Sequence, residues 1–215
     1  MDEHAVIARA HALAGRCLAE VADELRWPVP TDPKRAKGWA GELIERALGA
    51  TAGPRPLPDF PELGLEVKTI PVNRRGRPQE ATFVCLVSLS DNLSETWQTS
   101  LVRRKLARVL WVPIDAEPGV SIGERRIGTA RVWTPSAEQE QVLRADYEEI
   151  MDLICLGEIE TLSSRLGSYL QVRPKAMNGK DKTRAAAADG SLAWTLPRGF
   201  YLRATFTAQL IRDSA

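Results

Sequence analysis

Three residues in one short stretch have the types and the spacing that metal-assisted hydrolysis of a phosphodiester requires. Asp59 ends a proline-rich segment, and Glu66 and Lys68 lie two positions apart on a predicted strand, 64–70, with their side chains on one face. Carboxylate oxygens suit Mg²⁺, which activates an attacking water and stabilises the charge that develops on phosphorus. With the backbone carbonyl of Val67 as a further ligand, the sequence predicts a magnesium site formed by Asp59, Glu66 and Val67, beside which Lys68 orients the water.

The spacing D-x6-E-x-K has an ordinary interpretation as well. Carboxylate and lysine pairs two residues apart are common on exposed strands, and an aspartate often starts a turn. Two observations favour the functional interpretation. Six of the fourteen prolines fall within residues 51–78 and restrict the loop that carries Asp59, and basic segments elsewhere in the chain could hold a phosphate backbone.

The composition excludes several other chemistries. The chain has 215 residues, with only two histidines and three widely separated cysteines, none at metal-binding spacing. Serine and cysteine nucleophile systems and zinc sites would all have to be built from these few residues. The apolar runs are too short to span a membrane, and the first residues do not resemble a secretion signal. We therefore expect a cytoplasmic protein whose chemistry depends on carboxylates and lysines.

The net charge of +1 conceals a segregation of charge along the chain. Residues 138–160 contain eight acidic residues and one basic residue, whereas residues 171–212 contain eight basic and two acidic ones. A second basic group lies at 103–108. Such segments either form ordinary solvated surface or meet a polyanion on one face. We expect the basic segments to line a nucleic-acid site and the acidic helix to lie away from it.

Hydrophobic periodicity indicates alternating helices and strands. Helices are predicted over 3–26, 37–48, 99–107 and 136–156 and at the C-terminal end, and strands over 64–70, 81–89, 109–114, 169–173 and 199–202. The run 81–89 is nearly continuously apolar, as in a strand buried on both faces. Residues 177–191 have no apolar period and are predicted to form a mobile loop or a frayed helix. The pattern is that of an α/β protein built around a central mixed sheet flanked by helices.

Longer motifs give the chain a specific resemblance. Pro58-Asp59 with Glu66-Val67-Lys68 resembles the PD-(D/E)xK nuclease motif. Over about residues 10–210 the chain resembles the MutH family, the strand-specific endonucleases of DNA mismatch repair. The segments that carry this resemblance are Lys37-Gly38-Trp39, Leu63-Gly64-Leu65-Glu66-Val67-Lys68-Thr69-Ile70-Pro71-Val72, Thr82-Phe83-Val84-Cys85, Gln171-Val172-Arg173-Pro174-Lys175-Ala176 and Leu196-Pro197-Arg198-Gly199-Phe200-Tyr201-Leu202.

The resemblance assigns roles residue by residue. It implies that the catalytic residues are Asp59, Glu66, Lys68, Glu45 and Lys105. It implies DNA contacts by Arg173, Lys175, Tyr201, Lys37 and Phe83. Arginine suits bidentate recognition of guanine, and a bulky side chain beside adenine would meet an added N6 methyl group. Core packing is the alternative for the two aromatic residues, and ordinary surface charge is the alternative for Glu45 and Lys105.

The resemblance also implies an activity, a fold and partners. The family nicks the unmethylated strand of hemimethylated GATC sites with Mg²⁺, and MutL activates it after MutS has met a mismatch. A restriction-endonuclease-like fold is implied, with two lobes around a DNA cleft, approximately 1–100 plus the C-terminal helix and 101–200, within a single domain 1–215. One D-x6-E-x-K motif per chain is consistent with a monomer that cuts one strand. A GATC restriction endonuclease that cuts both strands and a catalytically inactive DNA-binding module are the alternatives.

Overall fold

The computed structural model describes residues 2–32, 36, 38–90, 95–175, 181–187 and 189–213. The chain forms two compact units whose segments interleave in the sequence. The first unit comprises Met1–Glu80, Ala107–Thr134 and Ala208–Ala215, and the second comprises Ala81–Leu106 and Pro135–Thr207. The division into two lobes that the family resemblance implies, approximately 1–100 plus the C-terminal helix and 101–200, stays a prediction.

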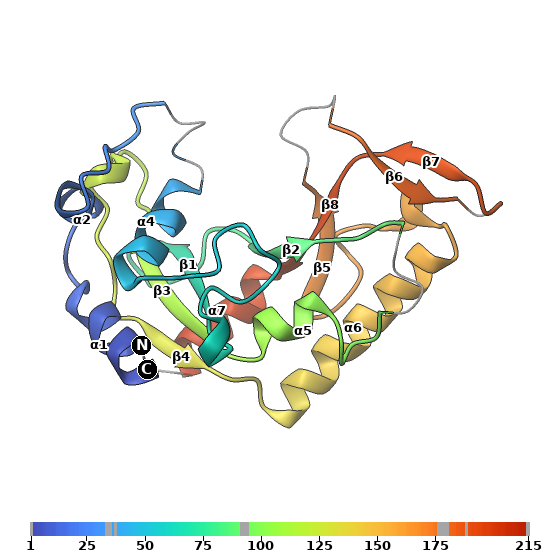
Figure 1. Ribbon diagram of the computed structural model, residues 1–215, viewed down its shortest axis with the longest axis horizontal. Coiled ribbons are helices and arrows are strands. Elements are labelled where there is room, and N and C mark those ends of the chain that lie inside the picture. The colour runs from blue at the N-terminus through green and yellow to red at the C-terminus, as the bar shows by residue number, and fades with distance from the viewer. Residues whose placement is uncertain are drawn as a thin grey trace. The chain divides into compact units, whose positions relative to one another are not determined.

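The first unit is built on a mixed three-stranded sheet. Strands β1 (Glu66–Val72), β3 (Val109–Asp115) and β4 (Arg131–Trp133) lie in the order β1-β3-β4. β1 is parallel to β3, with Glu66 opposite Val109, and β4 is antiparallel to β3. Helix α4 (Trp39–Leu48) packs against β1 (Figure 1). Leu43, Ile44 and Leu48 of this helix are fully buried, which confirms the apolar stripe predicted for it.

The predicted helix over 3–26 is wrong in one respect, because the structure divides it into α1 (Glu3–Ala12) and α2 (Leu18–Glu24). Between them Gly15 adopts a left-handed φ of 81° and donates its amide hydrogen to the carbonyl of Ile127. Cys17 then forms an isolated bridge with Arg126. Apolar spacing continues through this break because both helices bury residues in the same core, so periodicity alone did not reveal it.

The second unit contains an antiparallel sheet in the order β2-β8-β5, formed by β2 (Thr82–Leu86), β8 (Arg198–Leu202) and β5 (Leu170–Pro174). Helices α5 (Leu101–Leu106) and α6 (Ala137–Cys155) pack against β2 and β5 respectively (Figure 1). The ring of Tyr147 on α6 lies 5.6 Å from that of Phe200 on β8, so α6 covers the face of the sheet to which Phe200 points. As predicted, Ser136 caps α6 by accepting from the amide of Gln139.

Two predictions for this unit are wrong. Residues 183–186, expected in a loop or frayed helix, form β6 (Thr183–Ala186), which pairs with β7 (Leu192–Thr195) in an antiparallel hairpin. Its stability comes from cross-strand pairing, which leaves no apolar period in the sequence. Strand β2 is also not buried on both faces, since Leu86 is exposed.

Short elements complete the fold. Three 3-10 helices, η1 (Pro61–Leu63), η2 (Ile122–Glu124) and η3 (Ile159–Thr161), lie in connections, and α7 (Ala204–Asp213) follows β8. Within the part of the chain that the structure describes, no helix combines the length and the hydropathy that crossing a membrane demands. None of the three cysteines forms a disulfide.

Candidate active site

A small closed loop brings the two predicted carboxylates together. Phe60 and Leu65 form an isolated antiparallel bridge, in which each amide donates to the other's carbonyl at 2.9 and 3.2 Å. The turn between them is the 3-10 helix η1, followed by Gly64 with a left-handed φ of 58°. Asp59 and Glu66 are the next residues outward on the two arms of this bridge. The six-residue gap in the motif is therefore the length of the loop that sets them side by side.

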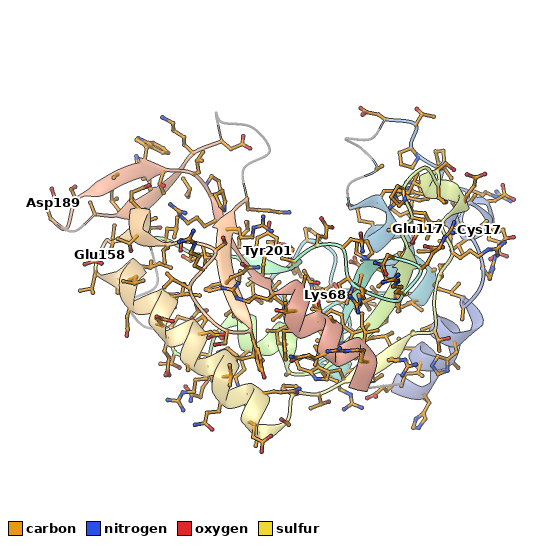
Figure 2. The ribbon with its side chains drawn as sticks, turned by 180° about the vertical axis from the view of Figure 1, so that it is seen from behind. Cys17, Lys68, Glu117, Glu158, Asp189 and Tyr201 are labelled. Atoms are coloured by element: carbon orange, nitrogen blue, oxygen red, sulfur yellow. The ribbon has the colours of Figure 1, made fainter. Side chains whose placement is uncertain are left out.

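Asp59, Glu66 and Lys68 lie in one polar group at the start of β1. Oδ2 of Asp59 accepts a hydrogen bond from the Val67 amide at 2.8 Å, and the Asp59 carbonyl accepts from the amides of Thr51 and Ala52. The ammonium of Lys68 donates to Oε1 of Glu66 at 2.5 Å. The Glu66 side chain is only 1% exposed and that of Lys68 13%, so their ion pair is largely removed from water. Lys68 is labelled in Figure 2. The structure thus brings the three residues of the motif together.

The donors in this group fit a magnesium ion. Two adjacent carboxylates and a main-chain carbonyl on the same strand are hard oxygen ligands, and Mg²⁺ commonly keeps several waters in addition to such ligands. No group of three or more histidine, cysteine, aspartate or glutamate side chains suited to a metal occurs among the residues that the structure describes. The predicted set of Asp59, Glu66 and the carbonyl of Val67 has only two side-chain ligands, and it stays a prediction.

Glu45 belongs to the helix that packs on this strand. It is half-buried on α4, one turn after Gly41. A Cβ atom placed on Gly41 would lie 3.5 Å from Oγ1 of Thr69 and 4.0 Å from Oε1 of Glu45. The Glu45 carboxylate is therefore close to the surface where α4 meets β1, beside the residue that follows Lys68. Its catalytic role stays a prediction.

Lys105, the second predicted catalytic lysine, belongs to the other unit. It is half-buried in the last turn of α5, between Arg104, which is exposed, and Leu106, which is buried. The structure describes this lysine and its helix within the second unit only. Its proposed part in catalysis therefore rests on the family resemblance.

Three of the five predicted DNA-contacting residues lie on one sheet of the second unit, and a fourth, Lys175, directly follows its strand β5. Phe83 on β2 is opposite Tyr201 on β8, and their rings meet edge to face at 5.3 Å. Tyr201 is labelled in Figure 2. The ammonium of Lys175 lies 4.3 Å from the centre of the Phe83 ring, and the guanidinium of Arg173 lies 5.8 Å from that of Tyr201. We call these four residues the aromatic-cation cluster. The fifth residue, Lys37, lies outside the described residues.

The cluster is on the face of the sheet opposite to the buried one. Tyr201 alternates with Phe200 and Leu202, which are 3% and 0% exposed, whereas Tyr201 and Phe83 are half-buried and Arg173 is exposed. Side chains alternate between the two faces of a strand. Aromatic rings and cations therefore occupy the face that α6 does not cover, where a polyanion can reach them.

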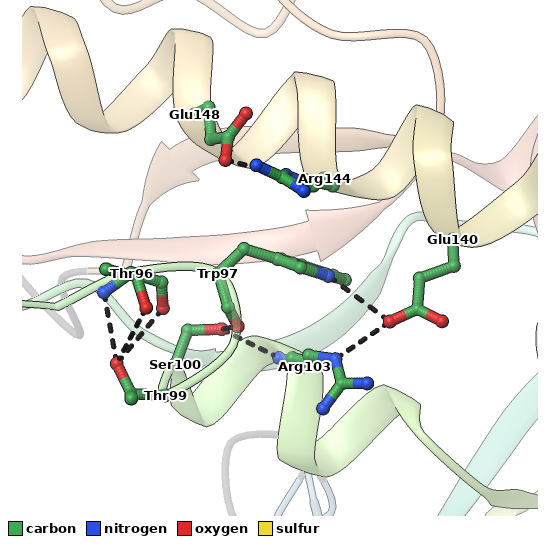
Figure 3. A network of polar contacts seen from close by, with 8 residues as sticks. All are labelled: Thr96, Trp97, Thr99, Ser100, Arg103, Glu140, Arg144 and Glu148. Atoms are coloured by element: carbon green, nitrogen blue, oxygen red, sulfur yellow. Dashed lines mark hydrogen bonds and ion pairs between the residues drawn. The ribbon is translucent and has the colours of Figure 1, made fainter.

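Several basic residues that the sequence analysis assigned to a polyanion site are instead structural. Nε of Arg103 on α5 donates to Glu140 on α6 at 2.8 Å, and the indole of Trp97 donates to the same carboxylate oxygen (Figure 3). Arg108 pairs with Glu3 in the first unit. Arg203 donates to three main-chain carbonyls in residues 164–167. Their charges hold elements together, and the expectation that the basic segments line a nucleic-acid site stays a prediction.

Sequence reasoning missed the role of Asp146, which it counted as part of an acidic surface. Asp146 is 6% exposed and accepts hydrogen bonds from the amides of Ser168, Tyr169 and Leu170 at 2.7, 2.7 and 2.8 Å. These amides begin β5, the strand that carries Arg173. A signal existed in the sequence, because Asp146 follows the buried Leu143 by three positions and so falls on the inner stripe of the helix.

Comparisons with known proteins show which family the chain resembles. Residues 48–146 match the family described as "MutH: DNA mismatch repair enzyme MutH". The chain is 52% identical over 210 residues to the DNA mismatch repair protein MutH of Pectobacterium atrosepticum, covering 98% of this chain and 91% of that protein. It is 49% identical over 210 residues to the proteins of the same name from Yersinia enterocolitica and Yersinia pestis, covering 98% of this chain and 92% of each.

Proposed function

Because the chain belongs to the MutH family, as the sequence resemblance predicted, we propose that it is the endonuclease of methyl-directed DNA mismatch repair. It hydrolyses one phosphodiester on the unmethylated strand of a hemimethylated GATC site. The observation that carries this proposal is the closed loop that sets Asp59 and Glu66 side by side, with Lys68 paired to Glu66. That arrangement matches the chemistry of metal-assisted phosphodiester hydrolysis.

In this proposal Asp59, Glu66 and the carbonyl of Val67 hold Mg²⁺, which when bound activates water and stabilises the charge on the scissile phosphate. The Val67 amide fixes the Asp59 carboxylate, so the carboxylate needs little rearrangement to act as a ligand. Lys68 keeps its ammonium beside Glu66, where it orients the attacking water and adds positive charge near the phosphate. Glu45 and Lys105 are proposed as further active-site residues.

Recognition of the site belongs, in this proposal, to the aromatic-cation cluster. Arg173 contacts guanine O6 and N7, and Tyr201 stands against the adenine, where an N6 methyl group would press on its ring. Phe83 makes an apolar contact, and Lys175 and Lys37 contact DNA near the phosphates. The two-lobed DNA cleft that the family resemblance implies stays a prediction.

We also propose the partners and the assembly of the family for this chain. A monomer with one active centre nicks one strand, and MutL activates it after MutS has met a mismatch. The closed loop carries one set of motif residues, and the part of the chain that the structure describes shows no second D-x6-E-x-K arrangement. A cytoplasmic location is expected for such an enzyme.

The test uses duplexes with one GATC site that is unmethylated, hemimethylated or fully methylated, with each strand labelled separately. We expect Mg²⁺-dependent nicking of unmethylated strands only, stimulated by MutL. Absence of strand-selective nicking with and without MutL would refute the proposal. Double-strand breaks made by the monomer would identify a restriction endonuclease, and binding without any cleavage would identify an inactive module.

Replacement of the first carboxylate tests the chemistry itself. Asp59→Ala should abolish nicking while binding to the GATC duplex persists, because the substitution removes a proposed metal ligand and leaves the other unit unchanged. Glu62→Ala is the matched control, since Glu62 is an exposed carboxylate in the same loop and should retain activity. Nicking by Asp59→Ala at the rate of the control would exclude Asp59 from catalysis.

A further inference from the structure

Strand β2 contains a β-bulge that changes which of its side chains face outward. Phe83 lies opposite Tyr201, and three residues later Leu86 lies opposite Gly199, with the register shifted between them. In a regular strand, residues three positions apart point to opposite faces. The bulge inserts one residue, and both residues between Phe83 and Leu86 are buried. Leu86 therefore shares the outward face with Phe83. β-Bulges commonly redirect a side chain in this way.

Leu86 is consequently 60% exposed on the face that carries the aromatic-cation cluster. Gly199 on the central strand separates it from Arg173, because Gly199 pairs with Leu86 on one side and with Arg173 on the other. Two strand spacings place Leu86 and Arg173 about 10 Å apart. That distance is about three base-pair steps of roughly 3.4 Å, so one four-base-pair site can meet both residues.

Gly199 has a packing reason to lack a side chain. A Cβ atom at this position would lie 2.8 Å from Cε2 of Phe83 and 3.2 Å from Cε2 of Tyr201. Glycine within a strand often marks such a close approach. At Gly199, strand β8 therefore has no side chain between Leu86 and Arg173. The exposed side chains of this row across the sheet are those of Leu86 and Arg173.

We propose that Leu86 contacts a methyl group in the major groove of the bound site and thereby contributes to its recognition. The inference rests on the proposed function, in which Arg173 and Tyr201 read polar edges of guanine and adenine. The other groups in that groove are the polar thymine O4 and cytosine N4 and the methyl groups, and only a methyl group suits an apolar side chain. The methyl group belongs either to thymine C5 or to N6-methyladenine on the methylated strand.

The test combines a change of the Leu86 side chain with the removal of individual methyl groups from the DNA. Wild-type protein and Leu86→Ala are assayed for kcat/KM on duplexes in which deoxyuridine replaces thymine, one strand at a time, and on hemimethylated against unmethylated duplexes. Removal of the contacted methyl group should lower the wild-type kcat/KM about threefold to fivefold, the factor expected for one buried methyl. Leu86→Ala should still cut the site, and its kcat/KM should be the same with and without that methyl group.

Leu156→Ala is the matched control. Leu156 is 62% exposed at the end of α6, away from the β2-β8-β5 strands, and its replacement should keep the wild-type sensitivity. Urea unfolding midpoints of both variants should equal that of the wild type, because both side chains are exposed.

The arms distinguish the two sources of the methyl group. If Leu86→Ala loses the wild-type sensitivity to deoxyuridine, Leu86 contacts the methyl group of thymine. If it loses only the wild-type difference between hemimethylated and unmethylated duplexes, Leu86 contacts the methyl group of N6-methyladenine. Equal ratios for wild type and Leu86→Ala with both methyl groups would overturn this contact alone. Failure of the wild type to nick any GATC duplex would overturn the proposed function and the contact with it.

Discussion

The ion pair at the start of β1 predicts a specific loss of stability when Lys68 is replaced by Met in the absence of divalent metal. The Glu66 carboxylate is 1% exposed, and its partner ammonium lies 2.5 Å away at 13% exposure. Removing one member of a buried pair leaves the other charge uncompensated and costs roughly 3–5 kcal/mol. Because Lys68 retains some contact with water, we expect the lower end, about 3 kcal/mol.

Urea unfolding in EDTA, followed by fluorescence of the six tryptophans, measures this loss. With a slope of about 2 kcal/mol per molar urea, the midpoint of Lys68→Met should fall by about 1.5 M. Lys182→Met, which changes an exposed lysine, is the matched control and should leave the midpoint unchanged. The double variant Glu66→Gln with Lys68→Met should recover most of the loss, since no charge is then left unpaired. A fall below about 0.3 M, or a double variant as unstable as the single one, would refute the reasoning.

Two further predictions concern the loop and the helix pair. Gly64→Ala should lower the free energy of unfolding by about 1–2 kcal/mol in urea titrations, because the residue has a left-handed φ that alanine adopts only at a cost. A Cβ atom at this position would meet no neighbouring atom, so the loss comes from the backbone conformation alone. An unchanged stability would contradict this. Arg103→Ala should destabilise the protein by about 0.2–1 kcal/mol near pH 7. The hydrogen bond from Arg103 lowers the pKa of Glu140 below its ordinary value of 4.5. The stability that the Arg103–Glu140 pair contributes is therefore present above pH 4.5 and is lost as the pH falls through the lowered pKa. The difference between variant and wild type should vanish at the acid end of a pH series of unfolding curves, and a constant difference would exclude the ion pair as its source.

The residues of the catalytic motif could be predicted because their arrangement is local. Asp59 and Glu66 are joined by one short loop, and Glu66 and Lys68 share a strand face, so types and spacing were sufficient. Strands β1, β2, β3, β5 and β8 were predictable for the same reason, because alternation and apolar runs are properties of short segments. What the family resemblance added was the pair Glu45 and Lys105, whose positions depend on how separate elements pack.

Features that depend on pairing between distant segments could not be predicted. The bulge in β2 is defined by its register against β8, more than 100 residues away, and it made Leu86 exposed where an apolar run indicated burial. The pairing of β6 with β7 has no apolar period. The partners of Arg103 and Arg203 within the protein are likewise not revealed by sequence spacing.

The closed loop at Phe60 and Leu65 has a consequence for the order of folding. Contacts between residues so near in the chain form quickly, since a loop of about ten residues closes in roughly 10–100 ns. Pairing of β1 with β3 joins Glu66 to Val109 and must wait for a much longer segment to close. The two carboxylates can therefore meet before the sheet exists, and the later arrival of β3 buries an acidic pair that is already assembled.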